Sequence, residues 1–424
     1  MAPVYAWPLM MVGYTTLLYF LSKTASWRQA AIYTFIFFFG YFLTSLYWVS
    51  SSLFVEINKW WWALPFSLAG LPLLLALFPT VILSIVSHIE RLKIPLFIVG
   101  LIVADIARGY LFTGFPWNLP AHTWTFTETF MSTLPHIGFW GLNSVTIVLF
   151  CLPIFFSNKT KILYLIILLA IAFIPIKNNH VVDLPNNIIM VQANIPQHEK
   201  WDRNYIWRNF DSHIEMSKNA IKNDEPQIII WPETAIAEGF IKSPAPNIEF
   251  LNFLSSLPKD SLLISGYLNF DNDEAFNSVA VFNTDGDIIA KYDKHHLVPF
   301  GEYMPFGLDT ITGFSNFSKG TAPKIIHLDN HMFSFVPLIC YESIFARYLP
   351  ETTQSSIILN LTNDSWFGET AGPYQHFDHM IFRSYQSRTA SIRLSGNGMS
   401  AIILQNGKIV YLSSLNKIQT ITNN

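Results

Sequence analysis

Three polar side chains of different chemistry stand where buried strands are expected to end. Glu233 and Cys340 each follow an apolar run, and Lys294 lies in a segment at 291–306 that is rich in aromatic residues and proline. A carboxylate pressed against an aromatic ring can act as a general base, a lysine can stabilise an oxyanion, and a thiol at a strand end can act as a nucleophile. Together these three residue types predict acyl transfer through a thioester.

Each residue taken alone has a plainer interpretation. An acidic residue after a strand is usually a solvated loop residue, a single lysine is usually a surface cation, and a lone cysteine is often buried without reacting. The functional interpretation therefore depends on the three side chains coming together. Glu302, in the same segment as Lys294, can pair with that lysine.

The elements that must position these residues alternate between strands and helices. Short apolar runs bounded by Asn, Asp, Gly or Pro predict strands, and two longer segments of helical composition predict helices. This alternation indicates an α/β domain with a layered sheet. The strands are expected at residues 188–191, 228–231, 262–267, 278–282, 333–339 and 357–361, and the helices at 201–222 and 376–393.

The first 180 residues differ from the rest in their charge. The chain of 424 residues is 51% hydrophobic, 16% aromatic and 13% charged, whereas an ordinary soluble domain carries roughly 25% charged residues. Only 13 of the first 180 residues are charged, against 42 of the other 244. This composition excludes disorder and confines the membrane signal to the first half. The other 244 residues are enough for one soluble domain with its own core. The net charge of −3 gives no basic stripe, so we expect no nucleic-acid partner.

Six apolar stretches in the first half have the composition of membrane-spanning helices, which need roughly 17–25 residues. Lys and Arg are retained on the cytoplasmic side. The first, third and fifth loops carry six of them and the second and fourth loops carry one. Everything after residue 177 is therefore expected outside, which in a bacterium is the periplasm, and so is the N-terminus. The spans are expected near residues 4–22, 31–52, 62–86, 94–113, 136–156 and 161–177.

Two further pairs of residues have informative spacing. Asp105 and Arg108 lie three apart in the fourth predicted span, where an unpaired charge costs a few kcal/mol. We expect either an intramembrane ion pair or two residues near the outer interface, and no direct part in the chemistry. His376 and His379 have the spacing of metal ligands, but we expect a structural or hydrogen-bonding role for them. With two cysteines in the chain, a disulfide framework and a cysteine-rich zinc site are both excluded.

At these residues the chain resembles the nitrilase or carbon–nitrogen hydrolase superfamily. More closely, it resembles the apolipoprotein N-acyltransferase family, which fuses such a domain to a transmembrane bundle. The resemblance extends from about residue 3 to about residue 410. It is carried by TGFPW at 113–117, VQANIPQ at 191–197, KWD at 200–202, WPE at 231–233, KHHLVPFGE at 294–302, CYE at 340–342, TNDSWFG at 362–368 and GPYQH at 372–376.

The resemblance implies a fold class and a set of site residues. The expected fold is a polytopic α-helical membrane bundle at residues 1–180 followed by an α/β nitrilase-like α-β-β-α sandwich at residues 185–415. The implied catalytic residues are Glu233 as general base, Lys294 as oxyanion stabiliser and Cys340 as nucleophile. The implied supporting residues are Glu302, Tyr341 and Glu342. The implied substrate-binding residues are Trp201, Trp366 and Asn277, and the two tryptophans have packing as an equal alternative.

The resemblance also implies a reaction and its partners. Cys340 takes the sn-1 acyl chain of a membrane phospholipid, typically phosphatidylethanolamine, as a thioester. The chain then passes to the α-amino group of the N-terminal S-diacylglyceryl cysteine of an apolipoprotein. No metal or organic cofactor is implied. We expect a monomer that crosses the bacterial inner membrane several times, with a periplasmic catalytic domain, a phospholipid donor and a diacylated apolipoprotein acceptor.

Two other functions stay open from the sequence. One is a membrane-tethered nitrilase-type amidase or hydrolase that passes the thioester to water, and the other is a truncated relative without activity. Members of the family usually have one more helix before the segment that begins here and another after the catalytic domain. We expect this chain to lack both.

Overall fold

The structure is a computed structural model that describes residues 1–176, 187–200, 202–222, 224–272, 274–305, 316–328, 333–349 and 356–423. The chain divides into two compact units. The first comprises Met1–Asn179 and Phe367–Gln386, and the second comprises His180–Trp366 and Ser387–Asn424. The first unit is thus built from two separate stretches of sequence.

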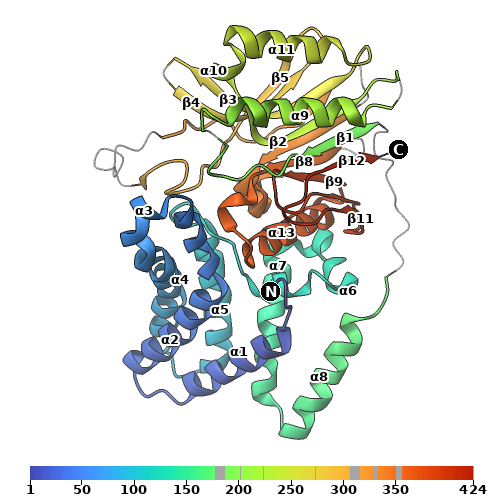
Figure 1. Cartoon of the computed structure of the whole chain (residues 1–424). Coiled ribbons are helices and arrows are strands. Elements are labelled where there is room, and N and C mark those ends of the chain that lie inside the picture. Colours follow the sequence, from blue (N-terminus) through green and yellow to red (C-terminus); the bar gives the residue numbers. More distant parts are fainter. Residues whose placement is uncertain are drawn as a thin grey trace. The chain divides into compact units, whose positions relative to one another are not determined.

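Six apolar helices dominate the described part of the first unit, and each overlaps a predicted span (Figure 1). A helix pairs its backbone polar groups internally, so apolar side chains alone suit it to a lipid environment. The six are α1 (Trp7–Ser22), α2 (Trp27–Ser45), α4 (Leu64–Val86), α5 (Lys93–Tyr110), α7 (Leu134–Cys151) and α8 (Asn158–Ala172). Shorter helical segments connect them: η1 (Tyr47–Glu56), α3 (Ile57–Trp60), η2 (Trp61–Ala63), η3 (Pro120–Trp124), α6 (Glu128–Met131) and η4 (Leu152–Phe155).

Not all six helices have the length and composition of a full span. Among the described residues, Ile57–Val86 and Leu134–Phe155 are long and apolar enough to cross a membrane, and the bent pair Trp27–Ser45 with Tyr47–Val55 would make a third span. Helices α1 and α8 have 16 and 15 residues, and α5 carries three charged residues. The structure therefore supports a membrane bundle, and the crossing of all six helices stays a prediction.

Arg108 binds the polar groups at the end of α5. Its Nη2 lies 3.1 Å from Oδ1 of Asp105, and the side-chain amide of Asn143 donates to the other carboxylate oxygen at 3.0 Å. Its Nη1 donates to the carbonyls of Phe115 and Trp117 at 2.9 and 2.7 Å. The predicted ion pair is present, and the arginine also fixes the segment that follows the helix.

The second stretch of the first unit is dominated by helix α13 (Gly372–Ser387). The indole N–H groups of Trp48 and Trp117 both donate to the side-chain oxygen of Gln375, at 3.0 and 2.9 Å. Nδ1 of His379 lies 3.3 Å from Nε2 of His122. The neighbour of His379 is thus another imidazole, which agrees with a hydrogen-bonding role.

We predict that Arg108→Met destabilises the first unit. The substitution leaves Asp105 buried without its cation, and breaking a buried pair in this way costs about 3–5 kcal/mol. Thermal unfolding of the full chain in detergent should show a clearly lower midpoint. The double variant with Asp105→Asn should recover part of the loss. Arg91→Met, at an exposed loop position, is the control, and equal midpoints for the two single arginine variants would contradict the prediction.

The second unit contains two six-stranded sheets in its described residues. In the first, strands β1, β2 and β3 run parallel, and β12 and β4 join antiparallel at either side. In the second, β7, β8 and β9 run parallel, flanked by antiparallel β6 and β10. The order of the first sheet is β12 (Gln419–Asn423), β1 (Ile188–Gln192), β2 (Ile228–Ala237), β3 (Leu262–Asp271), β4 (Glu274–Phe282), β5 (Ile288–Asp293). The order of the second is β11 (Ile409–Leu412), β10 (Ala401–Ile403), β9 (Ser391–Ser395), β8 (Ser356–Thr362), β7 (Phe333–Ile339), β6 (Ile326–Leu328).

The central strands are buried on both faces, which explains why they read as continuous apolar runs. Helices α9 (Ile206–Ala220) and α11 (Pro244–Ser255) lie on one face of the first sheet (Figure 1), and α10 (Glu238–Ile241) precedes α11. Trp231 of β2 and Phe253 of α11 stack in the core between this sheet and its helices, with ring centroids 5.6 Å apart. On the other face, β2 contacts β8 and β9 of the second sheet. The predicted nitrilase-like fold class is confirmed.

One helix boundary predicted from composition is wrong. The segment expected to be helical to residue 393 ends as helix at Ser387, and Ser391–Ser395 form strand β9. Arg393 makes this strand look polar in sequence. Its side chain is fully buried and is neutralised by a carboxylate, so the strand still suits the core.

Candidate active site

Glu233 lies where strand β2 leaves the regular sheet. The pairing of β2 with β3 loses its register between Trp231 and Ile236. Thr234 has a φ of +51°, in the left-handed region. On the neighbouring strand, a Cβ at Gly266 would lie 2.3 Å from both the Pro232 carbonyl oxygen and the Thr234 nitrogen. The irregular turn that presents Glu233 therefore requires glycine at position 266.

Lys294 follows β5 directly and is almost completely buried. Its Nζ lies 2.9 and 2.8 Å from the two carboxylate oxygens of Glu302 and 3.8 Å from Oε1 of Glu233. The amide nitrogen of Asn277 donates to Oε1 of Glu233 and to Oε1 of Glu302, each at 2.8 Å. The lysine and the asparagine thus hold two carboxylates together in a buried place.

Cys340 follows β7 as the first residue of a short 3₁₀ helix, η7 (Cys340–Ile344), with a φ of +48°. The thiol is buried, and the hydroxyl of Thr362 at the end of β8 is hydrogen-bonded to it. The charges of Glu233 and Lys294 act on the thiol. The structure therefore brings the three predicted catalytic residues into one electrostatic cluster.

Glu342 connects the segment of Lys294 to the segment of Cys340. Its Oε1 accepts hydrogen bonds from the Tyr292 hydroxyl at 2.7 Å and from the backbone N–H groups of His295 and His296 at 2.8 and 3.0 Å. Its Oε2 accepts from the backbone N–H of Ile339 at 2.8 Å. One carboxylate thus fixes the backbone on either side of the site. Tyr341 packs its ring near His296 and Phe345, with centroids 5.7 and 5.2 Å away.

Burial and charge set the protonation states in this cluster. Burial raises the pKa of Glu233 above its ordinary value, and the charge of Lys294 opposes that rise. Burial alone would lower the pKa of Lys294, but the carboxylates of Glu302 and Glu233 outweigh it and the pKa is raised. Burial, and then the charge of Glu233, raise the pKa of the Cys340 thiol to about 12. At neutral pH the lysine is a cation, and the thiol is protonated and needs a base.

A second polar network lies behind the nucleophile and was not predicted. Arg393 binds a carboxylate oxygen of Asp364 and the amide oxygen of Asn360, each at 2.6 Å. Asp364 accepts a hydrogen bond from Thr362 at 3.2 Å, and Asn360 donates to the carbonyl of Leu338 at 3.0 Å. Asp364 lies in the motif at 362–368. Nothing in the sequence indicates that Arg393 binds it.

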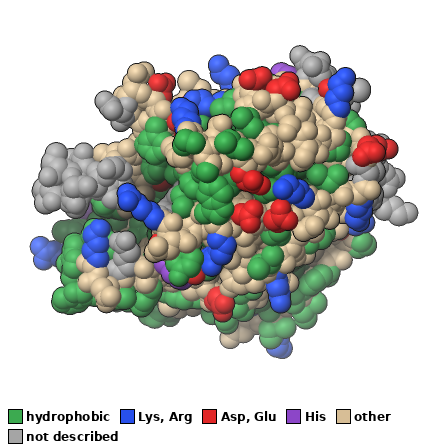
Figure 2. All heavy atoms as spheres, turned by 45° about the horizontal axis from the view of Figure 1, so that its top comes forward, with side chains coloured by type: hydrophobic (Ala, Val, Ile, Leu, Met, Phe, Trp, Pro, Cys, Tyr) green, Lys and Arg blue, Asp and Glu red, His purple; other side chains and the backbone are tan. Residues whose placement is uncertain are grey.

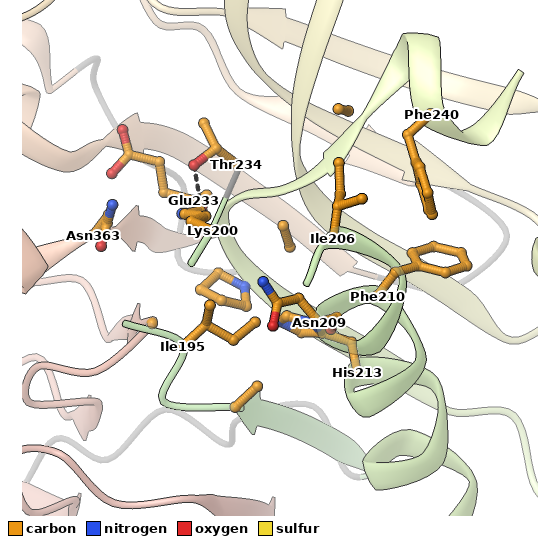
Figure 3. Close-up of a pocket in the computed structure, with 15 residues that line it drawn as sticks. Ile195, Lys200, Ile206, Asn209, Phe210, His213, Glu233, Thr234, Phe240 and Asn363 are labelled. Atoms are coloured by element: carbon orange, nitrogen blue, oxygen red, sulfur yellow. Dashed lines mark hydrogen bonds between the residues drawn. The ribbon is translucent and has the colours of Figure 1, made fainter. Parts of the chain in front are cut away.

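A pocket opens beside Glu233 within the second unit (Figure 3). Its wall combines apolar side chains from α9 and α10 with the polar side chains of Lys200 and Asn363. Nζ of Lys200 donates to the backbone carbonyl of Glu233 at 2.8 Å. Lys200 is a second lysine at the site. It stands in the motif KWD at 200–202, but no pattern in the sequence predicts a role for it.

Not every predicted site residue joins the cluster. Trp201 lies outside the described residues. Trp366 lies in the short helix η9 (Asp364–Phe367), and its side chain is 41% exposed. Asn277, Glu302 and Glu342 all bond within the site. Among the described residues, no group of three His, Cys, Asp or Glu side chains is arranged to hold a metal ion.

We predict that Glu233→Gln changes how the reactivity of Cys340 depends on pH. With Glu233 as base, alkylation by iodoacetamide should level off once this carboxyl has lost its proton. Without the base, the rate should rise about tenfold per pH unit up to the pKa of the thiol itself, because only the thiolate reacts. Peptide mass spectrometry after a timed reaction measures Cys340 separately from Cys151. Glu215→Gln, on the exposed side of α9, is the control. Profiles of the same shape for Glu233→Gln and the wild type would exclude Glu233 as the base.

Two family models match the chain. The carbon-nitrogen hydrolase model matches residues 188–424, and the model of the apolipoprotein N-acyltransferase N-terminal domain matches residues 1–152.

Curated proteins and solved structures match as well. The apolipoprotein N-acyltransferase of Rickettsia typhi is 32% identical over 99% of this chain and 88% of that protein. That of Brucella melitensis is 33% identical over 88% of this chain and 75% of that protein. Among solved structures, the nitrilase superfamily member Nit3 of Saccharomyces cerevisiae matches with a TM-score of 0.41 and 17% identity, over 57% of this chain and 91% of that chain.

Proposed function

The chain belongs to the apolipoprotein N-acyltransferase family and is an acyltransferase with a carbon–nitrogen hydrolase domain, and from this membership we propose a residue-level mechanism for lipoprotein N-acylation. The observation that carries the proposal is the buried cluster in which Lys294 and Asn277 bind two carboxylates, those of Glu233 and Glu302. The charges of Glu233 and Lys294 also act on the thiol of Cys340. A base, a cation and a nucleophile are the three parts that thioester chemistry needs.

In the first half of the proposed reaction, Cys340 takes an acyl chain from a phospholipid. The Glu233 carboxylate accepts the thiol proton, and the sulfur attacks the carbonyl carbon of the sn-1 ester. The ammonium group of Lys294 stabilises the oxyanion of the tetrahedral intermediate. The ester C–O bond then breaks, and Glu233 returns the proton to the departing oxygen. The products are an acyl-thioester enzyme and a lysophospholipid.

In the second half, the α-amino group of the S-diacylglyceryl cysteine of an apolipoprotein attacks the thioester. Glu233 accepts a proton from the attacking nitrogen, the C–S bond breaks, and Cys340 takes the proton back. An amide forms and the thiol is regenerated, so no cofactor is needed for the balance of atoms or electrons. Asn277 and Glu302 keep Glu233 and Lys294 in place during both halves.

The chain is a membrane protein with apolar helices in its first unit. We propose that it crosses the bacterial inner membrane several times as a monomer, with residues 1–180 as the membrane bundle and residues 185–415 as a periplasmic catalytic domain. The loop charges of the sequence support this orientation. Acyl chains hold both proposed substrates in the membrane, so the phospholipid and the diacylated apolipoprotein reach the enzyme by lateral diffusion.

We predict that Cys340→Ser abolishes N-acylation of a diacylated lipopeptide by the purified full chain in phospholipid vesicles, and that Glu233→Ala and Lys294→Ala do the same. Denaturing mass spectrometry of the wild type with phospholipid alone should find one acyl chain on Cys340. Cys151→Ser, which alters the buried cysteine of α7, is the matched control and should keep its activity.

Two outcomes would contradict this mechanism. Acylated peptide from folded Cys340→Ser would remove Cys340 as the nucleophile. Free fatty acid released without acylated peptide would instead favour a hydrolase that passes the thioester to water.

The orientation has its own test. A reporter enzyme that is active only in the periplasm, fused after residue 424, should be active, because the residues after 177 are expected outside. The same reporter fused in the loop at residues 87–92 should be inactive. The reverse pattern would overturn the orientation and leave the chemistry untouched.

A further inference from the structure

Lys200 contacts the backbone of the proposed base. Its Nζ donates to the carbonyl oxygen of Glu233 at 2.8 Å, and the hydroxyl of Thr234 donates to the same oxygen at 2.8 Å. Figure 3 shows Lys200 close to Glu233 and Thr234, away from the aromatic rings of Phe210 and Phe240 on the opposite wall of the pocket. One carbonyl therefore accepts two hydrogen bonds at the residue whose side chain enters the cluster.

The backbone at this point needs such support. Thr234 has a left-handed φ of +51°, which costs free energy for a residue with a branched side chain, and β2 loses its regular pairing here. Gly266 presses against one side of this turn. Lys200 lies 33 residues earlier in the chain than Glu233 and donates to its carbonyl, so two separate segments contact this turn.

The charge of Lys200 is a second feature of the arrangement. Lys294 lies 2.8 and 2.9 Å from the oxygens of Glu302 but 3.8 Å from Glu233, so it serves the other carboxylate more directly. The positive charge of Lys200 acts on both Glu233 and Cys340. The other titratable group in the pocket is His213, and burial lowers its pKa to about 4, so it is neutral at pH 7. Burial lowers the pKa of Lys200 to about 8, which leaves it mostly a cation at pH 7.

We infer that Lys200 is a positioning residue for Glu233: it fixes the carbonyl of the base and, as a second cation, favours the carboxylate that accepts the Cys340 proton. This inference rests on the proposed function only in taking Glu233 as the base. In the proton transfer itself, Glu233 gains the proton of the thiol and Lys200 keeps its own. A lysine that only filled the pocket wall would leave the ionisation of Glu233 unchanged.

The test is the pH profile of Cys340 alkylation by iodoacetamide in the full chain, read by peptide mass spectrometry. Lys200→Met removes both the hydrogen bond and the charge. The acid limb of the profile, where the rate rises as Glu233 loses its proton, should move to higher pH. Without this cation, Glu233 loses its proton less readily. The rate at pH 7 should fall about tenfold to a hundredfold, the range for a lost hydrogen bond to a charged group.

A second variant and a control separate position from folding. Lys200→Gln keeps a hydrogen-bond donor but removes the charge. The acid limb of its profile should therefore also move to higher pH, and its rate at high pH should fall less than that of Lys200→Met. Lys218→Met, an exposed lysine on α9, should match the wild type. If Lys200→Met does not fold, Lys200→Gln decides.

Unchanged acid limbs in the folded Lys200 variants overturn the inference and leave the proposed function standing. A wild-type profile without any acid limb removes Glu233 as the base, and the inference falls with it.

Discussion

An ammonium group shared between two buried carboxylates is the interaction on which the rest of the site depends. Removing charges from water is expensive, and a lone carboxyl in this position would keep its proton and could not act as a base. Lys294 supplies the balancing charge for Glu302 and Glu233, and Asn277 bonds to both acids. The thiol of Cys340 is therefore buried within the electrostatic influence of a carboxyl whose charged form Lys294 favours.

The fold maintains this balance by joining the ends of strands from both sheets. Glu233 comes from the first sheet and Cys340 from the second, and Glu342 ties the backbone next to Lys294 to the backbone before the nucleophile. Over the face that Figure 2 shows, acidic and basic side chains are intermixed.

Features that depend on neighbouring residues could be predicted from the sequence, and contacts between residues far apart in the chain could not. Parallel strands are buried on both faces, so β1, β7 and β8 read as apolar runs and were predicted to within a residue at each end. The start of β2 was predicted too, but the strand continues to Ala237, six residues beyond its apolar run. Motif resemblance pointed to Glu233, Lys294 and Cys340. Arg393 and Lys200 were missed because each is defined by a partner about thirty residues away, which no local pattern encodes. The end of α13 was misjudged because a buried, neutralised arginine looks like a surface residue.

Helix α13 has a consequence for how the molecule is made. Its contacts belong to the first unit, yet it lies in the chain between β8 and β9 of the second. No single cut in the chain separates the two units. During synthesis the helices of the first 176 residues leave the ribosome long before α13 does, so Gln375 and His379 reach Trp48 and His122 only after most of the second unit has been translated. The first unit can thus be completed only after most of the second unit has been synthesised.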